Sequence, residues 1–238
     1  MTTPKLSVCI PVYPRNDGLI EKFLTESFVI LINQNFKDFN IIVSDQSSSN
    51  KILDLCENFS SLLKIKYVKN ESKTPSLANN MNNALRNADG EIVKILFQDD
   101  FLIRYDALEK IVQGFENSAK KWLLTGFTHC NSDRSKFFDT RIPWFGNKYV
   151  NGDNTTGNPS TYAVKREFVV EMDENLKFLV DGELFYRTYF LHGDPIIINE
   201  ILVSFREHEH SSFDKPEFYN LLEKEKQYCV EKYKNLCK

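Results

Sequence analysis

The sequence predicts an α/β protein with a mostly parallel central sheet flanked by helices. In the first hundred residues, short apolar runs alternate with segments in which apolar residues recur every three or four positions. The short runs are apolar almost throughout, which is typical of strands buried on both faces, and the longer segments have the period of helices. Because helices separate the strands, we expect right-handed crossovers between parallel neighbours.

The expected elements of this half alternate regularly along the chain. They are strand 5–13, helix 17–34, strand 39–46, helix 50–64, strand 65–70, helix 74–91 and strand 91–97. The apolar stripe of the first helix comprises Ile20, Phe23, Leu24, Phe28 and Leu31. In the third helix, Thr74 is expected to be the cap, Pro75 the first helical residue and Gly90 the end, with Leu77 on the apolar face.

Two helices are expected in the second half, one over residues 182–193 and a terminal one over 216–238. Leu221, Leu222 and Cys229 recur in the tail at helical spacing, so the simplest interpretation is a helix docked on the core. Contact of this helix with a membrane surface is the alternative. The glutamates of the tail disfavour it, because they dilute the positive charge of the lysines.

The composition excludes several classes of function. The 238 residues carry a formal net charge of -3 with both signs interspersed, so a basic surface for nucleic acid is not expected. The five cysteines include no C-x-x-C pair, which argues against a disulfide framework and a structural zinc site and favours a reducing compartment. The start of the chain is unlike a leader, and the longest apolar run, FVILI, is too short for a bilayer. We therefore expect a cytoplasmic protein.

Polar residues gather where the strands of the first half end. The three ends carry Pro11, Val12 and Tyr13, then Ser44, Asp45 and Gln46, and finally Gln98, Asp99 and Asp100. In open α/β sheets ligands bind at the carboxyl ends of the strands, so these residues are expected to line one crevice. Neither G-x-G-x-x-G nor G-x-x-x-x-G-K-[ST] occurs in the sequence. The sequence therefore lacks a glycine-rich phosphate-binding loop. A magnesium or manganese ion held by Asp99 and Asp100 would neutralise the phosphates of a nucleotide in its place.

Seven segments together resemble a known family. They are LSVCIPVY, QNFKDFNIIVSDQSSSN, SLANNMNNALRNADGE, ILFQDD, GNPSTYAVKREFV, MDENLKFLVDGELFYRTYFLHG and IINEILVSFREHEHSS. In order and spacing they resemble family 2 glycosyltransferases, the bacterial-type sugar transferases of glycan and polysaccharide synthesis, over about the first 212 residues. The resemblance implies the GT-A fold, with a mostly parallel Rossmann-like sheet flanked by helices and a mixed sheet in the second half. It also implies one domain over 1–238, with a donor-binding half (1–100), an acceptor-binding and catalytic half (101–215) and a C-terminal helix (216–238).

The resemblance further implies roles for nine residues. The donor nucleotide would contact Pro11, Val12, Tyr13, Asp45, Asn80 and Asp99. A divalent cation, Mn²⁺ or Mg²⁺, would be held by Asp100, and His208 of the segment FREHEH would be a further metal ligand. Asp181 would be the catalytic base.

Three positions depart from the family's pattern. Pro14 and Gln98 stand where the family commonly has an asparagine and a third acid, and Val180 stands where it has a glutamate. Glu183, two residues beyond Asp181, therefore stays open as an alternative base.

The implied reaction is transfer of a sugar from a UDP- or dTDP-sugar to a hydroxyl of a glycan or lipid-linked saccharide. A carboxylate would take the proton of the acceptor hydroxyl, and a cation would stabilise the leaving diphosphate, in a single displacement with inversion. A lipid-linked acceptor would bring the protein to the inner face of a membrane. Two other classes stay open, a nucleotidyltransferase on a similar sheet and a non-catalytic sugar- or nucleotide-binding protein of the same fold.

Overall fold

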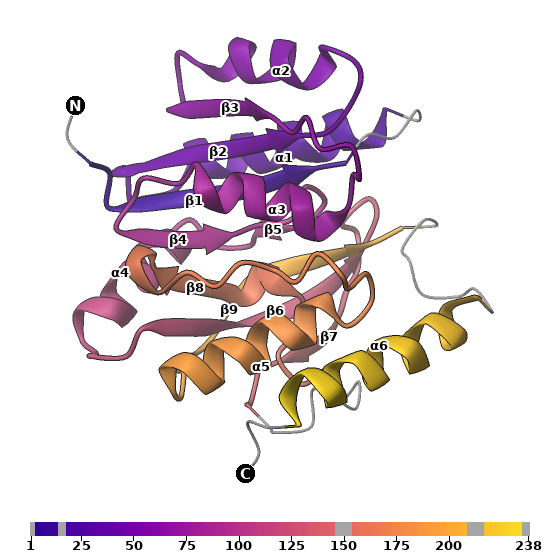
Figure 1. Ribbon diagram of the computed structural model, residues 1–238. Helices are drawn as coiled ribbons and strands as arrows, with labels where there is room; N and C mark the ends of the chain where they lie inside the picture. The colour runs from indigo at the N-terminus through magenta and orange to yellow at the C-terminus, as the bar shows by residue number, and fades with distance from the viewer. Residues whose placement is uncertain (1–2, 14–17, 146–153, 209–216, 235–238) are drawn as a thin grey trace.

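The computed structural model describes residues 3–13, 18–145, 154–208 and 217–234. The strands are β1 (Leu6–Val12), β2 (Phe39–Asp45), β3 (Ile65–Lys69), β4 (Ile92–Ile95), β5 (Phe101–Leu102), β6 (Trp122–Asn131), β7 (Phe137–Arg141), β8 (Tyr162–Lys165) and β9 (Ile196–Glu207). The helices are α1 (Leu19–Ile32), α2 (Lys51–Phe59), α3 (Leu77–Arg86), α4 (Ala107–Glu116), α5 (Val180–His192) and α6 (Glu217–Tyr233). Within the described residues the strands form one nine-stranded sheet (Figure 1), in the order β3-β2-β1-β4-β8-β6-β9-β5 with β7 paired to β6.

The sheet is parallel in its first half and mixed in its second. The strands β3, β2, β1 and β4 run parallel to their neighbours. The strand β8 lies antiparallel between β4 and β6, whereas β6 and β9 are parallel. Both parts of the predicted architecture are therefore confirmed. The register places Val12 opposite Asp45, so β1 and β2 end at the same level.

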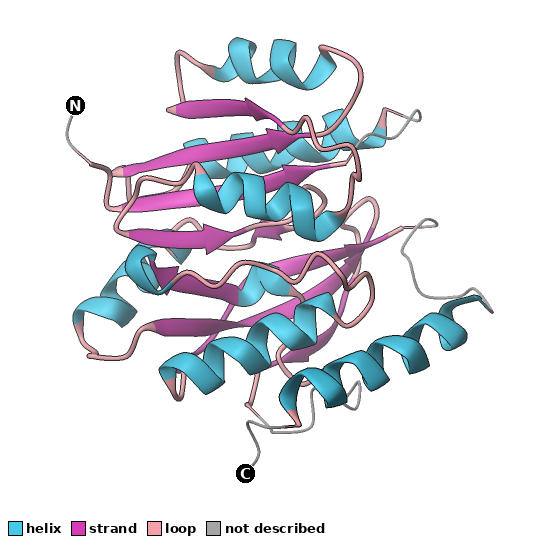
Figure 2. Cartoon of the chain, viewed as in Figure 1, coloured by secondary structure: helices cyan, strands magenta, loops and turns pink. Residues whose placement is uncertain are grey.

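Helices cover both faces of the sheet, as Figure 2 shows. Residues of α1, α2 and α4 form one apolar cluster with the sheet, and residues of α3, α5 and α6 form the other. Ile10 of β1 enters the first cluster and its neighbour Cys9 enters the second. This is why the strands are apolar on both faces, without the alternation of a half-exposed strand.

The tail is a helix docked on the core, as predicted. In α6, Cys229 and Tyr233 are buried, and α6 lies beside α5 at the lower right of Figure 1. Among the described helices, none combines the length and the apolarity that crossing a bilayer requires.

Several predicted boundaries were wrong. The cap of α3 is Ser76, whose side chain accepts a hydrogen bond from the Asn79 amide at 3.1 Å. Ser76 is extended, the conformation that a capping residue needs, so the helix begins at Leu77 and not at Thr74 or Pro75. Leu77 itself is 38% exposed and lies off the buried face. The helix predicted to end at residue 64 ends at residue 59, and the strand predicted over 91–97 spans only 92–95.

Gly90, predicted to end α3, lies instead against the start of β1. Its amide donates to Ser7 Oγ at 2.8 Å, and a Cβ at this position would lie 2.5 Å from the Ser7 backbone nitrogen. Backbone must therefore move to admit any side chain. We expect Gly90→Ala to lower the free energy of unfolding by about 2 to 3 kcal/mol, measured by urea denaturation.

Gly114, inside α4, provides the matched control for this prediction. A Cβ there would meet only side-chain atoms, the nearest being Ile198 Cδ1 at 3.4 Å. Gly114→Ala is expected to leave the free energy of unfolding unchanged or to raise it by up to about 1 kcal/mol, because alanine favours the helix. Equal effects of the two substitutions would contradict the close approach at Gly90.

Candidate active site

The ends of β1 and β2 are held together by an asparagine of α3. Asn80 is buried, and its Nδ2 donates to the Val12 carbonyl at 2.9 Å. Its Oδ1 accepts from Ser44 Oγ at 2.7 Å. The structure thus brings together Pro11 and Val12 at the end of β1 with Asn80, as expected for one side of a pocket at the strand ends.

Asp45, at the end of β2, is fully buried by donors from the protein. Its carboxylate accepts from the Ser47 amide at 2.7 Å, from Ser47 Oγ at 2.8 Å and from the Tyr67 hydroxyl at 2.8 Å. Lys69 Nζ lies 3.4 Å from Oδ2. Asp45 therefore shapes the loop that follows β2, and a nucleotide base would have to replace one of these donors to reach it.

Gln98 joins the end of β1 to the acidic turn. Tyr13 is 55% exposed, and its amide donates to Gln98 Oε1 at 2.8 Å. Gln98 and Asp99 form a turn between β4 and β5, so the acids follow the strand after a short gap. The sequence indicated Gln98 as one of the crevice residues and as a replacement for a third acid, and its side-chain carbonyl connects two of the predicted strand ends. Pro14 lies outside the described residues.

The acidic pair and His208 meet, but the two acids face different partners. Asp99 Oδ2 lies 3.1 Å from His208 Nε2. Asp100 is buried, and its carboxylate accepts from Asn158 Nδ2 at 2.7 Å and from the Arg206 amide at 3.3 Å. Burial, and then the charge of Asp99, raise the pKa of Asp100 well above the ordinary range of an aspartate.

Arg206 is buried and contacts several segments of the site, and the sequence did not predict a role for it. Its guanidinium donates to the carbonyl of Asp99 at 3.0 Å and to Glu26 at 2.7 Å, and it stacks over the ring of Phe23 at 4.1 Å. It therefore locks the acidic turn to α1 and β9. The only signal in the sequence was its place two residues before His208.

A buried lysine binds the segment that contains Asn158, the hydrogen-bonding partner of Asp100. Lys94 of β4 donates to the Ser160 carbonyl, and burial lowers the pKa of Lys94 to about 7. The Ser160 amide in turn donates to Asn158 Oδ1 at 2.7 Å, and Asn158 is the residue that binds Asp100. Through Asn158, these bonds fix the position of the Asp100 carboxylate.

The donor chemistry of the acidic turn fits a hard divalent cation in part. Within the described part of the chain, no group of three or more histidine, cysteine or acidic side chains is arranged to hold a metal. Asp99 and His208 are side by side and offer one oxygen and one nitrogen, which manganese accepts. Asp100 would have to release Asn158 or the Arg206 amide to join them, and substrate oxygens would have to complete the ligand set.

Asp181 has the features expected of a general base. It lies in the first turn of α5, which begins at Val180, so Asp181 does not cap the helix. Its Oδ1 is shielded from water and has no hydrogen-bonding partner among the described residues. Burial raises the pKa of Asp181 to about 7. A carboxylate in this state can accept a proton from a bound hydroxyl near neutral pH.

Glu183, the alternative base, is held in an ion-pair network. Its side chain is completely buried and lies 2.7 Å from Lys232 Nζ and 3.0 Å from Arg187 Nη2. The Tyr233 hydroxyl donates to the same carboxylate. With these donors in place, Glu183 has a structural role, and Asp181 is the better candidate for the base.

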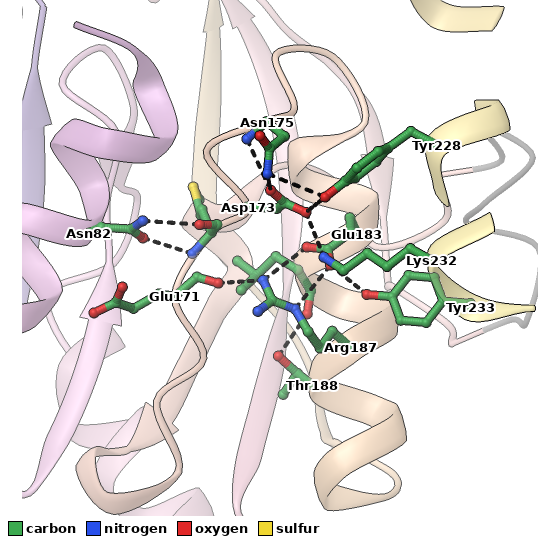
Figure 3. Close-up of polar contacts among 12 residues, drawn as sticks. Asn82, Glu171, Asp173, Asn175, Glu183, Arg187, Thr188, Tyr228, Lys232 and Tyr233 are labelled. Atoms are coloured by element: carbon green, nitrogen blue, oxygen red, sulfur yellow. Dashed lines mark hydrogen bonds and ion pairs between the residues drawn. The ribbon is translucent and has the colours of Figure 1, made fainter. Parts of the chain in front are cut away.

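The segment that leads to Asp181 is bound to α3 (Figure 3). Asn82 pairs with the backbone of Met172, donating to its carbonyl at 3.0 Å and accepting from its amide at 2.7 Å. Arg86 donates to Glu171 at 2.7 Å. The asparagine-rich stretch of α3 therefore binds two parts of the candidate site. Asn80 holds the ends of β1 and β2, and Asn82 holds the segment that leads to Asp181.

Relatives of known sequence are glycosyltransferases. The GalNAc(5)-diNAcBac-PP-undecaprenol β-1,3-glucosyltransferase of Campylobacter jejuni is 38% identical over 111 residues, 46% of this chain and 34% of that protein. The poly(ribitol-phosphate) β-N-acetylglucosaminyltransferase TarS of Staphylococcus aureus is 30% identical over 100 residues, 41% of this chain and 17% of that protein. The match thus spans about a third and a sixth of the lengths of these relatives.

Solved structures share the fold. S. aureus TarS 1-349 in complex with UDP-GlcNAc aligns with a TM-score of 0.71 at 20% identity, over 93% of this chain and 66% of that one. The mannosyltransferase PcManGT of Pyrobaculum calidifontis, in complex with GDP-Man and Mn²⁺, aligns with a TM-score of 0.59 at 15% identity, over 87% and 57%. These likenesses confirm the predicted GT-A architecture.

The family itself is shown by the sequence match. The family model described as Glycosyl transferase family 2 matches residues 7–172, which include both acids of the turn and end before Asp181 and His208. The resemblance to the family is therefore confirmed, and this chain belongs to glycosyl transferase family 2.

Proposed function

We propose that this protein is an inverting glycosyltransferase that moves a sugar from a UDP- or dTDP-sugar to a hydroxyl of a glycan acceptor, with Asp181 as general base. The observation that carries the proposal is the shielded, unpartnered Oδ1 of Asp181 in a chain of this family. A sugar hydroxyl is a poor nucleophile, and a carboxylate within hydrogen-bonding reach can take its proton as it attacks the anomeric carbon.

The donor nucleotide would occupy the ends of β1 and β2. Pro11, Val12 and Tyr13 would pack around the base and ribose, with Asn80 shaping the pocket through its bond to Val12. Asp45 would accept a hydrogen bond from the base after one of its present donors moves. Asp99 would contact the ribose or the sugar, which agrees with its partial exposure.

A divalent cation, Mn²⁺ or Mg²⁺, would be held by Asp100 and His208, with Asp99 next to both. When bound, such an ion stabilises the negative charge that develops on the leaving diphosphate. The ordered turn at Gln98 and the buried Arg206 keep this set in place before any ion arrives. Solved relatives of the same fold include one in complex with Mn²⁺, which supports the choice of metal.

The acceptor would be a glycan or a lipid-linked saccharide. The name of the Campylobacter relative includes an undecaprenol-linked saccharide, and this supports a similar class of acceptor here. The protein would then work at the inner face of a membrane. Residues 1–100 would bind the donor and residues 101–215 the acceptor, and the C-terminal helix over 216–238 would belong to the same domain.

A donor screen tests the proposed function. Purified protein is incubated with UDP-, dTDP- and GDP-sugars, with and without MnCl₂, and the released nucleoside diphosphate is measured. We expect release with a UDP- or dTDP-sugar that depends on the metal and increases with a glycan acceptor. Pyrophosphate release from a nucleoside triphosphate would indicate a nucleotidyltransferase, and donor binding without turnover would indicate a binding protein.

The pH dependence of turnover reports the state of the base. Burial raises the pKa of Asp181 to about 7, and the base works only when deprotonated. At saturating donor we therefore expect kcat to rise about tenfold per pH unit below pH 7 and to level off above it. An acidic limb centred near pH 4, the range of an exposed aspartate, would contradict a raised pKa of Asp181.

A further inference from the structure

The C-terminal helix α6 binds the turn from which the Asp181 helix begins. Glu225 of α6 is 4% exposed, and its carboxylate accepts from the amides of Lys177 at 2.8 Å, Phe178 at 2.9 Å and Leu179 at 2.8 Å. These amides immediately precede Val180, the first residue of α5. The residue at the cap position, Leu179, cannot supply a side-chain acceptor. Glu225 therefore fixes, from another helix, the turn that precedes α5, and one of its three donors is the amide of the cap residue Leu179.

Three further residues of α6 hold the chain before and after Asp181 (Figure 3). Lys232 Nζ lies 2.5 Å from Asp173 Oδ2 and 2.7 Å from Glu183 Oε1. Tyr233 donates to the same Glu183 carboxylate, and Tyr228 donates to Asp173 at 2.9 Å. Asp173 precedes Asp181 in the chain and Glu183 follows it, so α6 binds the chain on both sides of Asp181.

On its other side the segment is bound by α3. Asn82 pairs with the Met172 backbone and donates to Glu174 at 3.0 Å. The same helix holds the end of β1 through Asn80. The position of Asp181 relative to the donor pocket thus depends on two helices, α3 on the donor side and α6 on the far side.

We propose that α6 is a positioning element of the active site, in which Glu225 fixes the turn that carries Asp181. The inference rests on the proposed function, since it takes Asp181 as the base. Apolar side chains such as Cys229 attach α6 to the core, whereas the buried carboxylate of Glu225 is directed at the start of α5 alone. A misplaced base loses rate without loss of donor affinity, because the donor pocket lies on β1, β2 and α3.

Glu225→Gln tests this role with little change in size. Glutamine keeps one acceptor oxygen and loses the charge, so at least one of the three amides loses its partner. We expect kcat to fall about 10- to 100-fold, while the donor Kd, measured by calorimetry, stays within about twofold. The matched control is Glu231→Gln, because Glu231 is exposed on the same helix and pairs with the exposed Lys234. Its kcat should not change.

A double variant separates positioning from general damage. If Glu225 acts through Asp181, then Asp181→Asn combined with Glu225→Gln should be no slower than Asp181→Asn alone. Rates are expressed per folded molecule, with the folded fraction taken from thermal unfolding. Multiplicative losses in the double variant, or a Glu225→Gln enzyme with unchanged kcat, would overturn the proposal.

Tyr233→Phe covers the case in which Glu225→Gln does not fold. It removes one hydroxyl from Glu183 and leaves Lys232 and Arg187 in place. A fall in kcat of about 3- to 10-fold at unchanged donor Kd supports the role of α6, and unchanged kcat opposes it. An Asp181→Asn enzyme with unchanged kcat would refute Asp181 as the base in the proposed function, whereas a strongly impaired Asp181→Asn beside a fully active Glu225→Gln would refute only this inference.

Discussion

Asp181→Asn is expected to lower kcat by about 10²- to 10⁴-fold while leaving donor binding nearly intact. Asparagine keeps the size of the side chain but cannot take a proton from the acceptor hydroxyl. The donor pocket lies at the ends of β1 and β2, and α3 joins it to the segment that leads to Asp181, so the donor affinity should not change. Sugar transfer and donor Kd are measured on the same preparation, with a thermal melt to confirm folding.

Glu183→Gln is the companion variant, because Glu183 was the alternative base. It should lower thermal stability, since it breaks a buried network with Lys232 and Tyr233. Turnover retained by Asp181→Asn but abolished in folded Glu183→Gln would move the base to Glu183. Asp181 and Glu183 lie in the same turn of α5, so the two substitutions are made at nearly the same place in the chain.

Asp100→Asn is expected to lower kcat/KM by about 10²- to 10³-fold and to remove the dependence on manganese. The substitution replaces one carboxylate oxygen with an amide group, while the remaining side-chain oxygen can still accept from Asn158. The fold should therefore persist. Binding of UDP with and without MnCl₂, followed by calorimetry, reports the loss directly.

Asp106→Asn is the matched control for this variant. Asp106 follows the same turn a few residues later but pairs on the surface with Arg104 at 2.8 Å. Its manganese dependence and kcat/KM should equal those of the unmodified protein. If Asp100→Asn kept the metal response, the cation would have to be held by Asp99 and His208 without Asp100.

Much of the fold and part of the site could be predicted from local patterns. Apolar runs and helical periods predicted the parallel half of the sheet, because β1, β2 and β4 are buried on both faces and their sequences are therefore mostly apolar. The strand-end rule placed Val12 beside Asp45, and the register confirms this pairing. Boundaries were less predictable, since Ser76 and not Thr74 adopts the extended conformation of a cap.

The residues that sequence reasoning missed are those whose partners come from distant segments. Gln98 binds the Tyr13 amide, Arg206 binds the Asp99 carbonyl, and Glu225 binds three amides before α5. A side chain of this kind has no periodic or local signature, because its function depends on what the folded chain brings to it.

The fold class, the family and the strand ends at which polar residues collect could all be inferred from the order of the amino acids. The state of each carboxylate depends on contacts that exist only in the folded chain. Asp181 and Glu183 share one turn of α5 and look alike in the sequence, but α6 supplies Lys232 and Tyr233 to Glu183, whereas the Oδ1 of Asp181 stays shielded without a described partner. The physical reason is that the proton affinity of a buried carboxylate is set by neighbouring donors and exclusion of water, and both come from residues far along the chain.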